Sequence, residues 1–355
     1  MNGKISSNQT FAIEVGLVVA LFPGLANVLI LNMSRNASLL SVLIATIIGF
    51  IPVLMITSIS KKINNKSLKE YIIEQYGFIG HILNILLMLI AIFILLINSW
   101  LIIDFIISQF LTRTSYYFIA IVFFSIIAWN INKEIETTSR TIFILFWITI
   151  IIMILLWLTL VPYIKLDNLK PYIDVGRIKI IKSSIIYLTY TTLPIIYILD
   201  LKHIVNDKKN FEKRIVYAYI FSSVILLIFL FLIISVYTID IATILTYPVY
   251  SLFKKVQILG FIERIENFAA IQIVVAFFIQ GTYLLYYLRE NTLKKLKINK
   301  NIIKIGTYLI CLLIPIISIT IFKNYNFMIM VKKFPYVLSS LLIIIILLFL
   351  KKKRS

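Results

Sequence analysis

Long apolar blocks separated by short basic loops are the main pattern of the sequence. Each block holds roughly 20 predominantly apolar residues, enough for a helix to cross the hydrocarbon of a bilayer. Because the bilayer core offers no water to the backbone, such blocks favour helices, whereas a β-barrel would show short alternating strands. The pattern predicts about ten spans, at approximately 9–31, 38–60, 81–110, 116–131, 139–161, 181–200, 214–238, 267–289, 302–322 and 334–350.

Three segments between these spans are too polar to cross a bilayer. The stretch 162–180 contains two prolines and several charges, and the stretch 239–266 contains two lysines and an acidic run. We expect both to be connectors, the second with short interfacial helices. The stretch 66–80 has the apolar and polar spacing of an amphipathic surface helix, with an ordinary solvated linker as the alternative.

These elements predict an all-α membrane protein with a single integral domain over residues 1–355. The ten spans divide into two inverted five-helix repeats, 9–161 and 181–350, an arrangement found in transporters of the LeuT type. No extramembrane domain is predicted.

Composition and charge agree with a membrane protein. Apolar residues make up 61% of the chain and charged residues 14%, against about half and about a quarter in soluble domains. Membrane topology explains the net charge of +20, since basic residues gather in cytoplasmic loops, whereas a nucleic-acid partner would need a basic face on a folded soluble domain. With the N-terminus in the cytoplasm, 22 of the 35 Lys and Arg residues lie inside. We therefore predict that both termini are cytoplasmic.

Catalytic and metal-binding patterns are missing from the sequence. His81 and His203 have no cysteines, histidines or carboxylates clustered near them, so no metal site is predicted. The single cysteine, Cys311, lies in an apolar block. We find neither a phosphate-binding glycine loop nor a nucleophile motif, and we expect a protein that is not an enzyme and needs no cofactor.

Helix-breaking residues occur at matching positions of spans 1 and 6. Proline removes a helical hydrogen bond, and glycine allows close approach. Interrupted spans at the same position of two repeats indicate a transporter-type binding site, where free backbone N–H groups face an anionic group. The alternative is that these are ordinary prolines of membrane helices, like Pro52 and Pro315. The predicted ligand-binding residues in the two spans are Pro23, Gly24, Leu25, Ala26, Thr191, Thr192 and Pro194.

Three carboxylates lie within or near the predicted spans. Charged groups are costly in a bilayer and are functional candidates by default. Asp104 is deep in span 3 and is added to the predicted ligand site, with a neutral acid hydrogen-bonded to a neighbouring helix as the alternative. Glu14 lies near the inner end of span 1, and Asp200 is expected to be a solvated residue at the end of span 6.

Several motifs, taken in order along the chain, resemble one known family. The motifs are Lys66-Ser67-Leu68-Lys69-Glu70-Tyr71 with Gly77, Glu134-Ile135-Glu136 with Arg140, Leu169-Lys170-Pro171 with Gly176, Tyr247-Pro248-Val249-Tyr250, and Phe261-Ile262-Glu263-Arg264-Ile265-Glu266. Together with the chain length and the ten spans, they resemble the spore germination permease family. These proteins are the B subunits of nutrient germinant receptors, within the amino acid–polyamine–organocation superfamily.

The resemblance implies a receptor subunit in the inner membrane of a spore or in the cell membrane. It would bind a small nutrient, expected to be an amino acid, at the broken spans and signal through other germinant receptor subunits. One alternative is an amino-acid permease coupled to protons or another ion. Another is an assembly subunit without a working site, because a carboxylate that many members carry in span 6 is absent near Thr191 and Thr192. The fold alone does not separate these functions.

The acidic run before span 8 is predicted to take part in gating. Glu263 and Glu266 are three residues apart and would share one face of a helix, with Arg264 pointing partly away. We expect Glu263 and Arg264 to contact the connector 162–180 and to couple the two halves near the outer gate. The alternative is a solvated surface pair of little energy.

Overall fold

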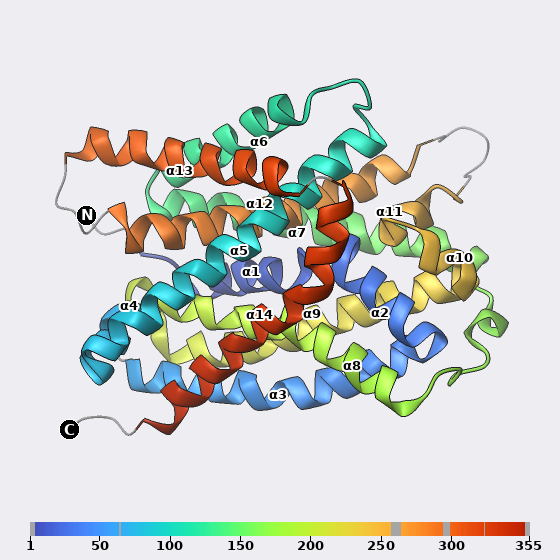
Figure 1. Ribbon diagram of the computed structural model, residues 1–355, viewed down its shortest axis with the longest axis horizontal. Coiled ribbons are helices and arrows are strands. Elements are labelled where there is room, and N and C mark those ends of the chain that lie inside the picture. Colours follow the sequence, from blue (N-terminus) through green and yellow to red (C-terminus); the bar gives the residue numbers. More distant parts are fainter. Residues whose placement is uncertain (1–3, 64, 257–263, 294–298, 323, 352–355) are drawn as a thin grey trace.

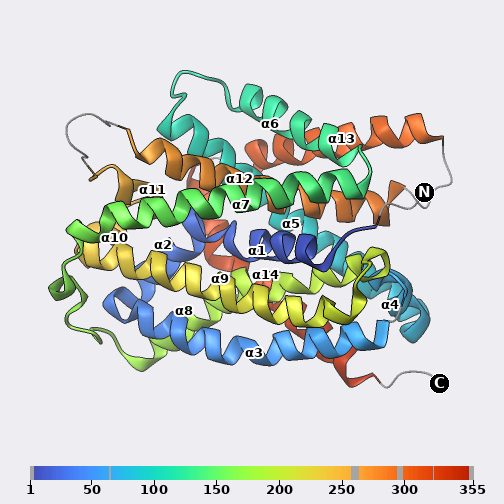
Figure 2. The ribbon, with the colours of Figure 1, turned by 180° about the vertical axis from the view of Figure 1, so that it is seen from behind.

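The computed structural model describes residues 4–63, 65–256, 264–293, 299–322 and 324–351, with the backbone alone over 324–333. Within these ranges the chain is almost entirely helical, and Ile5 and Val205 form an isolated β-bridge. The long helices lie side by side along one direction (Figures 1 and 2). The predicted all-α fold is confirmed.

The first half of the chain builds spans 1 to 5. A capping box between Ser6 and Gln9 begins its first helix, and a second one between Ser67 and Glu70 begins the helix predicted within 66–80. The elements of this half are α1 (Ser7–Val19), η1 (Phe22–Ala26), α2 (Asn27–Ser34), η2 (Arg35–Ala37), α3 (Ser38–Ile63), α4 (Leu68–Tyr76), α5 (Phe78–Gln109), α6 (Tyr116–Ile131) and α7 (Ile135–Leu160).

The second half builds spans 6 to 10. Two short helices occupy the connector 239–266, as predicted, and the connector 162–180 follows the turn η3 (Val161–Tyr163) and contains η4 (Leu166–Leu169). The elements of this half are α8 (Arg177–Tyr187), η5 (Leu188–Thr192), η6 (Leu193–Ile204), α9 (Lys208–Val236), α10 (Ile239–Ile244), α11 (Pro248–Phe253), α12 (Glu266–Asn291), α13 (Lys300–Ile321) and α14 (Asn324–Leu350).

Seven helical stretches of the described chain are long and apolar enough to cross a membrane. The first, Ser7–Ile63, contains two crossings, because the chain reverses direction at Arg35–Ala37 between α2 and α3 (Figure 1). Two shorter apolar helices, Tyr116–Ile131 and Phe334–Leu350, correspond to the predicted spans 4 and 10. These stretches together account for the ten predicted spans.

The two ends of the bundle carry different elements. One carries α4 and is called the α4 end here; α1 begins and α14 ends on this side (Figure 1). The opposite one carries α10, α11 and the connector 162–180, and is called the α10 end. The first and last described helices therefore begin and end on the same side, as an even number of crossings requires.

The outside of the bundle is strongly apolar. Large side chains such as Ile47 and Ile51 on α3, and Ile151 and Leu155 on α7, are exposed. Such a belt is unfavourable in water and is the surface that lipid chains cover. Many Ser, Thr and Asn side chains are instead buried between the helices, which is typical of helix packing in membranes.

Candidate functional site

Spans 1 and 6 are interrupted halfway along by the same kind of backbone. In span 1, α1 is followed by the π-helical turn η1, whose second residue is Pro23, and the N–H of Ala26 donates to the carbonyl of Leu21 (3.0 Å). In span 6, α8 is followed by the π-helical turn η5 and then by the 3-10 helix η6, whose second residue is Pro194. Each proline lacks the N–H that an unbroken α-helix would use, which explains the position of both interruptions.

The two interruptions pack against each other in the centre of the bundle. η1 contacts η5, while α1 packs along η6 and α2 packs along α8. Spans 1 and 6 therefore run antiparallel, as inverted repeats require. The structure thus brings the predicted residues of both spans into one region, where all are buried except Gly24, which is partly exposed.

Polar side chains satisfy the backbone groups that the interruption of span 1 sets free. The side chain of Gln280 in α12 donates to the carbonyl of Leu17 in the last turns of α1 (2.9 Å) and accepts from Asn98 in α5 (2.8 Å). Asn27 donates to the carbonyl of Pro23 (3.3 Å). Because buried backbone groups need partners, these side chains hold the interruption in place.

Asp104 joins the site through a tyrosine. The hydroxyl of Tyr247, which precedes α11, donates to Asp104 Oδ2 (2.6 Å), and the hydroxyl of Tyr116 lies 3.4 Å from Asp104 Oδ1. The Tyr247 ring also covers Gly24, since a Cβ added to Gly24 would lie 2.8 Å from Tyr247 Cε1. Any larger residue at this position would force the ring to move. Tyr247 therefore links the predicted residues Gly24 and Asp104.

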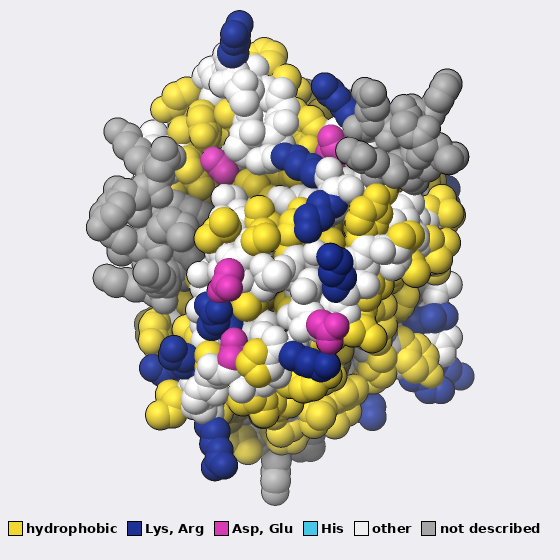
Figure 3. All heavy atoms as spheres, turned by 90° about the vertical axis from the view of Figure 1, so that its right-hand side faces the viewer, with side chains coloured by type: hydrophobic (Ala, Val, Ile, Leu, Met, Phe, Trp, Pro, Cys, Tyr) yellow, Lys and Arg dark blue, Asp and Glu magenta, His cyan; other side chains and the backbone are white. Residues whose placement is uncertain are grey.

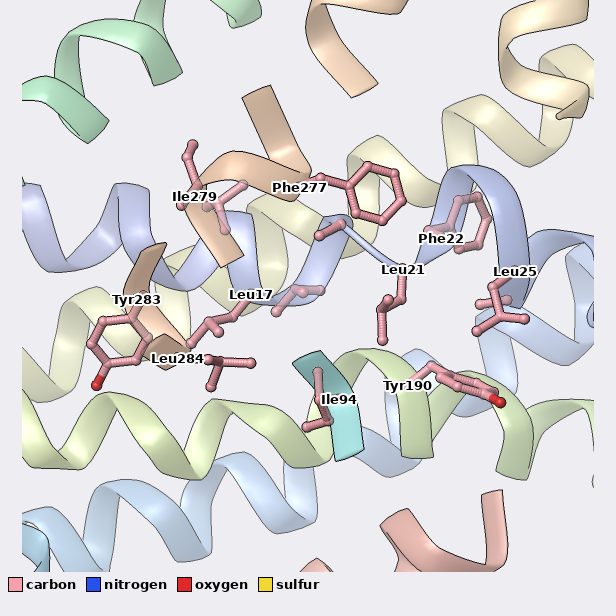
Figure 4. Close-up of a cluster of buried hydrophobic side chains, with 14 of the residues drawn as sticks. Leu17, Leu21, Phe22, Leu25, Ile94, Tyr190, Phe277, Ile279, Tyr283 and Leu284 are labelled. Atoms are coloured by element: carbon pink, nitrogen blue, oxygen red, sulfur yellow. The ribbon is translucent and has the colours of Figure 1, made fainter. Parts of the chain in front are cut away.

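The hydroxyls of Thr191 and Thr192 are used within span 6. Thr191 Oγ1 donates to the carbonyl of Tyr187 (2.7 Å) and lies 3.4 Å from Thr192 Oγ1. The Tyr187 hydroxyl in turn donates to Ser223 of α9 (3.4 Å). This group of hydroxyls lies toward span 7, and it is the neighbouring ring of Tyr190 that faces span 1 (Figure 4).

Apolar side chains fill the space between the two interruptions. Figure 4 shows Leu21 and Leu25 of span 1 directed towards Tyr190 of span 6, with Ile94 of α5 beside them. All four are buried, and the Tyr190 ring stacks on Phe334 of α14 with 5.7 Å between ring centroids. In this conformation the region is closed, so a ligand enters only after these side chains move.

A small cavity of about 60 Å³ lies beside the interruption of span 1. Pro23 lines it together with Val15, Gly16 and Val19, and mostly apolar residues of α7, α9, α11 and α12 form the other walls. This volume holds a few water molecules. Its lining residues carry no charged group, so it offers no ion-pair partner for the ends of an amino acid.

Asp200 is a correction to the sequence prediction, which placed it in solvent. It is only 5% exposed, and its Oδ1 accepts from the N–H of Leu68 at the start of α4 (3.2 Å), where a helix N-terminus favours a carboxylate. Nearby, the buried Lys202 donates to Glu212 Oε1 (2.6 Å) and to the carbonyl of Ser60 (2.6 Å). The α4 end of span 6 is therefore held by buried polar contacts.

The remaining candidates are Glu14 and the predicted gating residues Glu263, Arg264 and Glu266. Glu14 is buried in α1, and its Oε1 accepts no hydrogen bond from the described residues. Glu263 lies outside the described residues, and Arg264 and Glu266 form no ion pair within the described chain. Asp174 of the connector 162–180 pairs with Arg35 (3.3 Å). The contact expected between the connector and Glu263 or Arg264 stays a prediction.

Comparison with known proteins assigns the chain to a family. A family model described as "Spore germination protein" matches residues 4–328. The chain belongs to the spore germination protein family. The family model covers nearly the whole chain. A search of curated proteins found no significant match to the chain.

The fold of this spore germination protein is also found among solved transporters. One similar structure is described as the substrate-bound outward-open state of a Na+-coupled sialic acid symporter, with a TM-score of 0.65 and 10% sequence identity. The match covers 98% of this chain and 78% of the symporter chain. At this identity the likeness shows the LeuT-type fold and nothing about the substrate.

Sequence reasoning missed three side chains that shape the site. Tyr247 belongs to one of the family-like motifs, but no local pattern indicates that its ring lies over Gly24. Gln280 is a polar residue within an apolar span, which is a usable signal, because such residues usually bond to a neighbouring helix. Tyr190 had no signal beyond its position next to Thr191.

Proposed function

We propose that this protein is the integral membrane subunit of a nutrient germinant receptor and that it binds an amino acid between the interrupted spans 1 and 6. The observation that carries the proposal is that two interruptions, at matching positions of the two repeats, pack against each other in the middle of the bundle. Interrupted helices present backbone N–H groups whose partial positive charge suits a carboxylate.

In this proposal Tyr247 acts as a lid over the binding region. Its ring covers Gly24, and its hydroxyl is held by Asp104, so a ligand that approaches the backbone of span 1 must displace the ring. A ligand that binds the displaced conformation more tightly than the covered one shifts the population towards it. The segment that leads into α11 would then move with the ring and carry the signal to partner subunits.

Substitution of Gly24 tests the proposal directly. A leucine there would collide with the Tyr247 ring and fill the approach to span 1. Spores with Gly24→Leu should lose the response to the single nutrient that triggers spores with the unchanged protein, at an unchanged protein level. Gly176→Leu is the matched control, because a Cβ at Gly176 meets nothing within 4 Å. A normal response of the Gly24→Leu spores to every nutrient would place the ligand elsewhere.

A coupled amino-acid permease is the alternative use of the same region. Uptake of a labelled amino acid by the purified protein in liposomes, driven by a proton or sodium gradient, would identify a carrier. Binding without uptake supports the receptor. Neither binding nor uptake, with partner subunits that still need the protein for assembly, would identify an assembly subunit without a working site.

We also propose that the α4 end faces the cytoplasm. The lysines at the end of α3 and the start of α9 lie there, and basic residues are favoured on that side. Lys66 and Asp167 are exposed at the α4 end and in the connector 162–180, and the sole cysteine, Cys311, is buried. Lys66→Cys and Asp167→Cys should react with a membrane-impermeant maleimide from opposite sides, and labelling from one side would contradict this orientation.

A further inference from the structure

A polar pocket of about 460 Å³ opens at the α10 end, away from the interruptions of spans 1 and 6. Three segments that are distant in sequence form it: Arg35 and Asn36 after span 1, residues 167–174 of the connector, and Thr238 to Asp240 at the start of α10. Figure 3 shows this face of the molecule, where basic and acidic side chains lie close together. The pocket therefore offers both signs of charge to one small ligand.

Arg35 supplies the positive side of the pocket. Its Nε lies 3.3 Å from Asp174 Oδ2, and its Nη2 lies 2.6 Å from Asp240 Oδ1. The Asp240 side chain is 78% exposed, so its bond to Arg35 is worth little and another carboxylate can replace it. A guanidinium binds a carboxylate well, because its planar fork matches the two oxygens.

Asn36 and Asp174 each carry an acceptor atom that receives no hydrogen bond from the described part of the chain. Asn36 is 6% exposed, and its Nδ2 donates to the carbonyl of Lys170 (3.2 Å), which fixes the orientation of the amide. Asn36 Oδ1 and Asp174 Oδ1 are both buried and accept no hydrogen bond from the described residues. Leaving buried acceptors unpaired is costly. A primary ammonium carries three N–H donors and no acceptor, so it is the group that completes this site.

We propose that this pocket is a second ligand site that binds the zwitterionic backbone of an amino acid. The carboxylate lies on Arg35 in place of Asp240, and this exchange opens the buried Asn36 Oδ1 and Asp174 Oδ1 to the ammonium. Asp174 Oδ2 lies 3.3 Å from Arg35 Nε and 3.5 Å from the backbone nitrogen of Asn36, so Asp174 links the two sides of the proposed site. The site rests on the proposed function only in the choice of an amino acid as its ligand. A ligand there would join the segments that follow span 1, precede span 6 and follow span 7.

Protection of one engineered cysteine tests the proposal. Thr238 lines the pocket and is exposed, and Cys311 is buried, so Thr238→Cys gives a single reactive thiol in the full-length protein. The purified protein in detergent is treated with a maleimide in the presence of glycine, acetate or methylamine. Glycine carries both charged groups and no side chain, and the other two compounds carry one group each. Glycine should slow labelling in a saturable way, and acetate and methylamine should do so far less.

Two variants in the Thr238→Cys background assign the groups. Asn36→Leu should raise the glycine concentration that gives half protection about tenfold or more, because one buried hydrogen bond to the ammonium is lost. Asp240→Asn should lower that concentration, since it frees Arg35; this exposed position leaves the fold intact, so the test stands even if Asn36→Leu fails to fold. Glu74→Gln is the control, because its carboxylate is 50% exposed, pairs with Lys66 at the α4 end and does not line the pocket.

Some results would overturn the second site. These are no protection by glycine, equal protection by all three compounds, or half-protecting concentrations unchanged in both Asn36→Leu and Asp240→Asn. Adding Gly24→Leu separates this site from the proposed one at spans 1 and 6. Protection that persists in Gly24→Leu supports an independent pocket, whereas protection that is lost with Gly24→Leu assigns the effect to the interrupted spans and rejects the second site.

Discussion

The ion pairs around span 6 differ in burial between the two ends of the bundle. At the α4 end the contacts are buried or involve the backbone. The N–H of Ile5 donates to Ile204, and the N–H of Asn206 donates to Ile5 (3.1 and 2.9 Å). Lys202 and Glu212 form an ion pair whose side chains are 8% and 17% exposed.

At the α10 end the ion pairs are more accessible, although a buried hydrogen bond between Ser34 and Ser183 (2.9 Å) joins spans 1 and 6 there. Arg35, at 41% side-chain exposure, joins Asp174 and Asp240, and the Tyr247 hydroxyl meets Asp104 beneath α11. Exposed ion pairs contribute little, whereas breaking a buried one is expensive. The difference indicates that the Arg35 ion pairs at the α10 end break at a smaller energetic cost than the Lys202–Glu212 pair at the α4 end.

The largest expected effect comes from removing the buried cation at the α4 end. Lys202→Met leaves the Glu212 carboxylate without its cationic partner, with only the Ser60 hydroxyl still donating to it, and we expect a loss of about 3–5 kcal/mol of stability. Thermal unfolding in detergent measures it. Lys66→Met is the control, because Lys66 pairs with Glu74 at the surface of the same end and should cost less than about 1 kcal/mol. Equal shifts of the two variants would remove the contrast between buried and exposed contacts.

An intermediate effect is expected from the tyrosine lid at the α10 end. Tyr247→Phe keeps the ring over Gly24 but loses the hydroxyl that Asp104 accepts, a bond worth roughly 1.5–3 kcal/mol. A Leu25→Cys thiol, buried beside η5, should then react faster with a maleimide. Tyr76→Phe is the control, because that hydroxyl bonds to Leu347 at the α4 end. If the reaction rate at position 25 is the same with Tyr247 or Phe, the hydroxyl does not hold the lid.

A smaller effect is expected from the exposed ion pair of Arg35. Asp240→Asn removes one of the two carboxylates that contact the guanidinium, and we expect the unfolding free energy to change by less than about 1 kcal/mol. The same thermal measurement compares it with Lys202→Met. A loss as large as that of Lys202→Met would show that the exposed pair of Arg35 stabilises the fold as much as the buried pair of Lys202.

The smallest effect concerns the acid dependence of the contact that begins α1. Burial acts to raise the pKa of Asp207, but hydrogen bonds from the side chain and backbone of Ser7 lower the pKa below its ordinary value on balance. A carboxyl with a lowered pKa in the folded state stabilises the fold above its ordinary pKa, and this contribution is lost as pH falls through the folded pKa. Asp207→Asn should therefore flatten the acid limb of the stability curve and leave its neutral part lower. An acid limb of unchanged slope would contradict this role.

The sequence by itself determined the helices and the two interruptions. Bilayer thickness requires apolar stretches of a certain length, and this requirement is local, so Tyr116–Ile131 ends where the hydropathy predicts. Pro23 and Pro194 act on their own turns of helix, and the chain breaks at both. The family could also be predicted from the sequence, because each family-like motif is local and the motifs follow one another in order along the chain.

Only the tertiary structure decided which side chains meet across the bundle. Asp104 was a candidate because a carboxylate is costly in a span, but its partner Tyr247 lies 143 residues away. Asp200 was expected in solvent, and it is buried because the first turn of α4 folds over it and donates the N–H of Leu68. Such partnerships depend on helix directions and rotamers set by all the spans packing together, and one stretch of sequence carries no record of them.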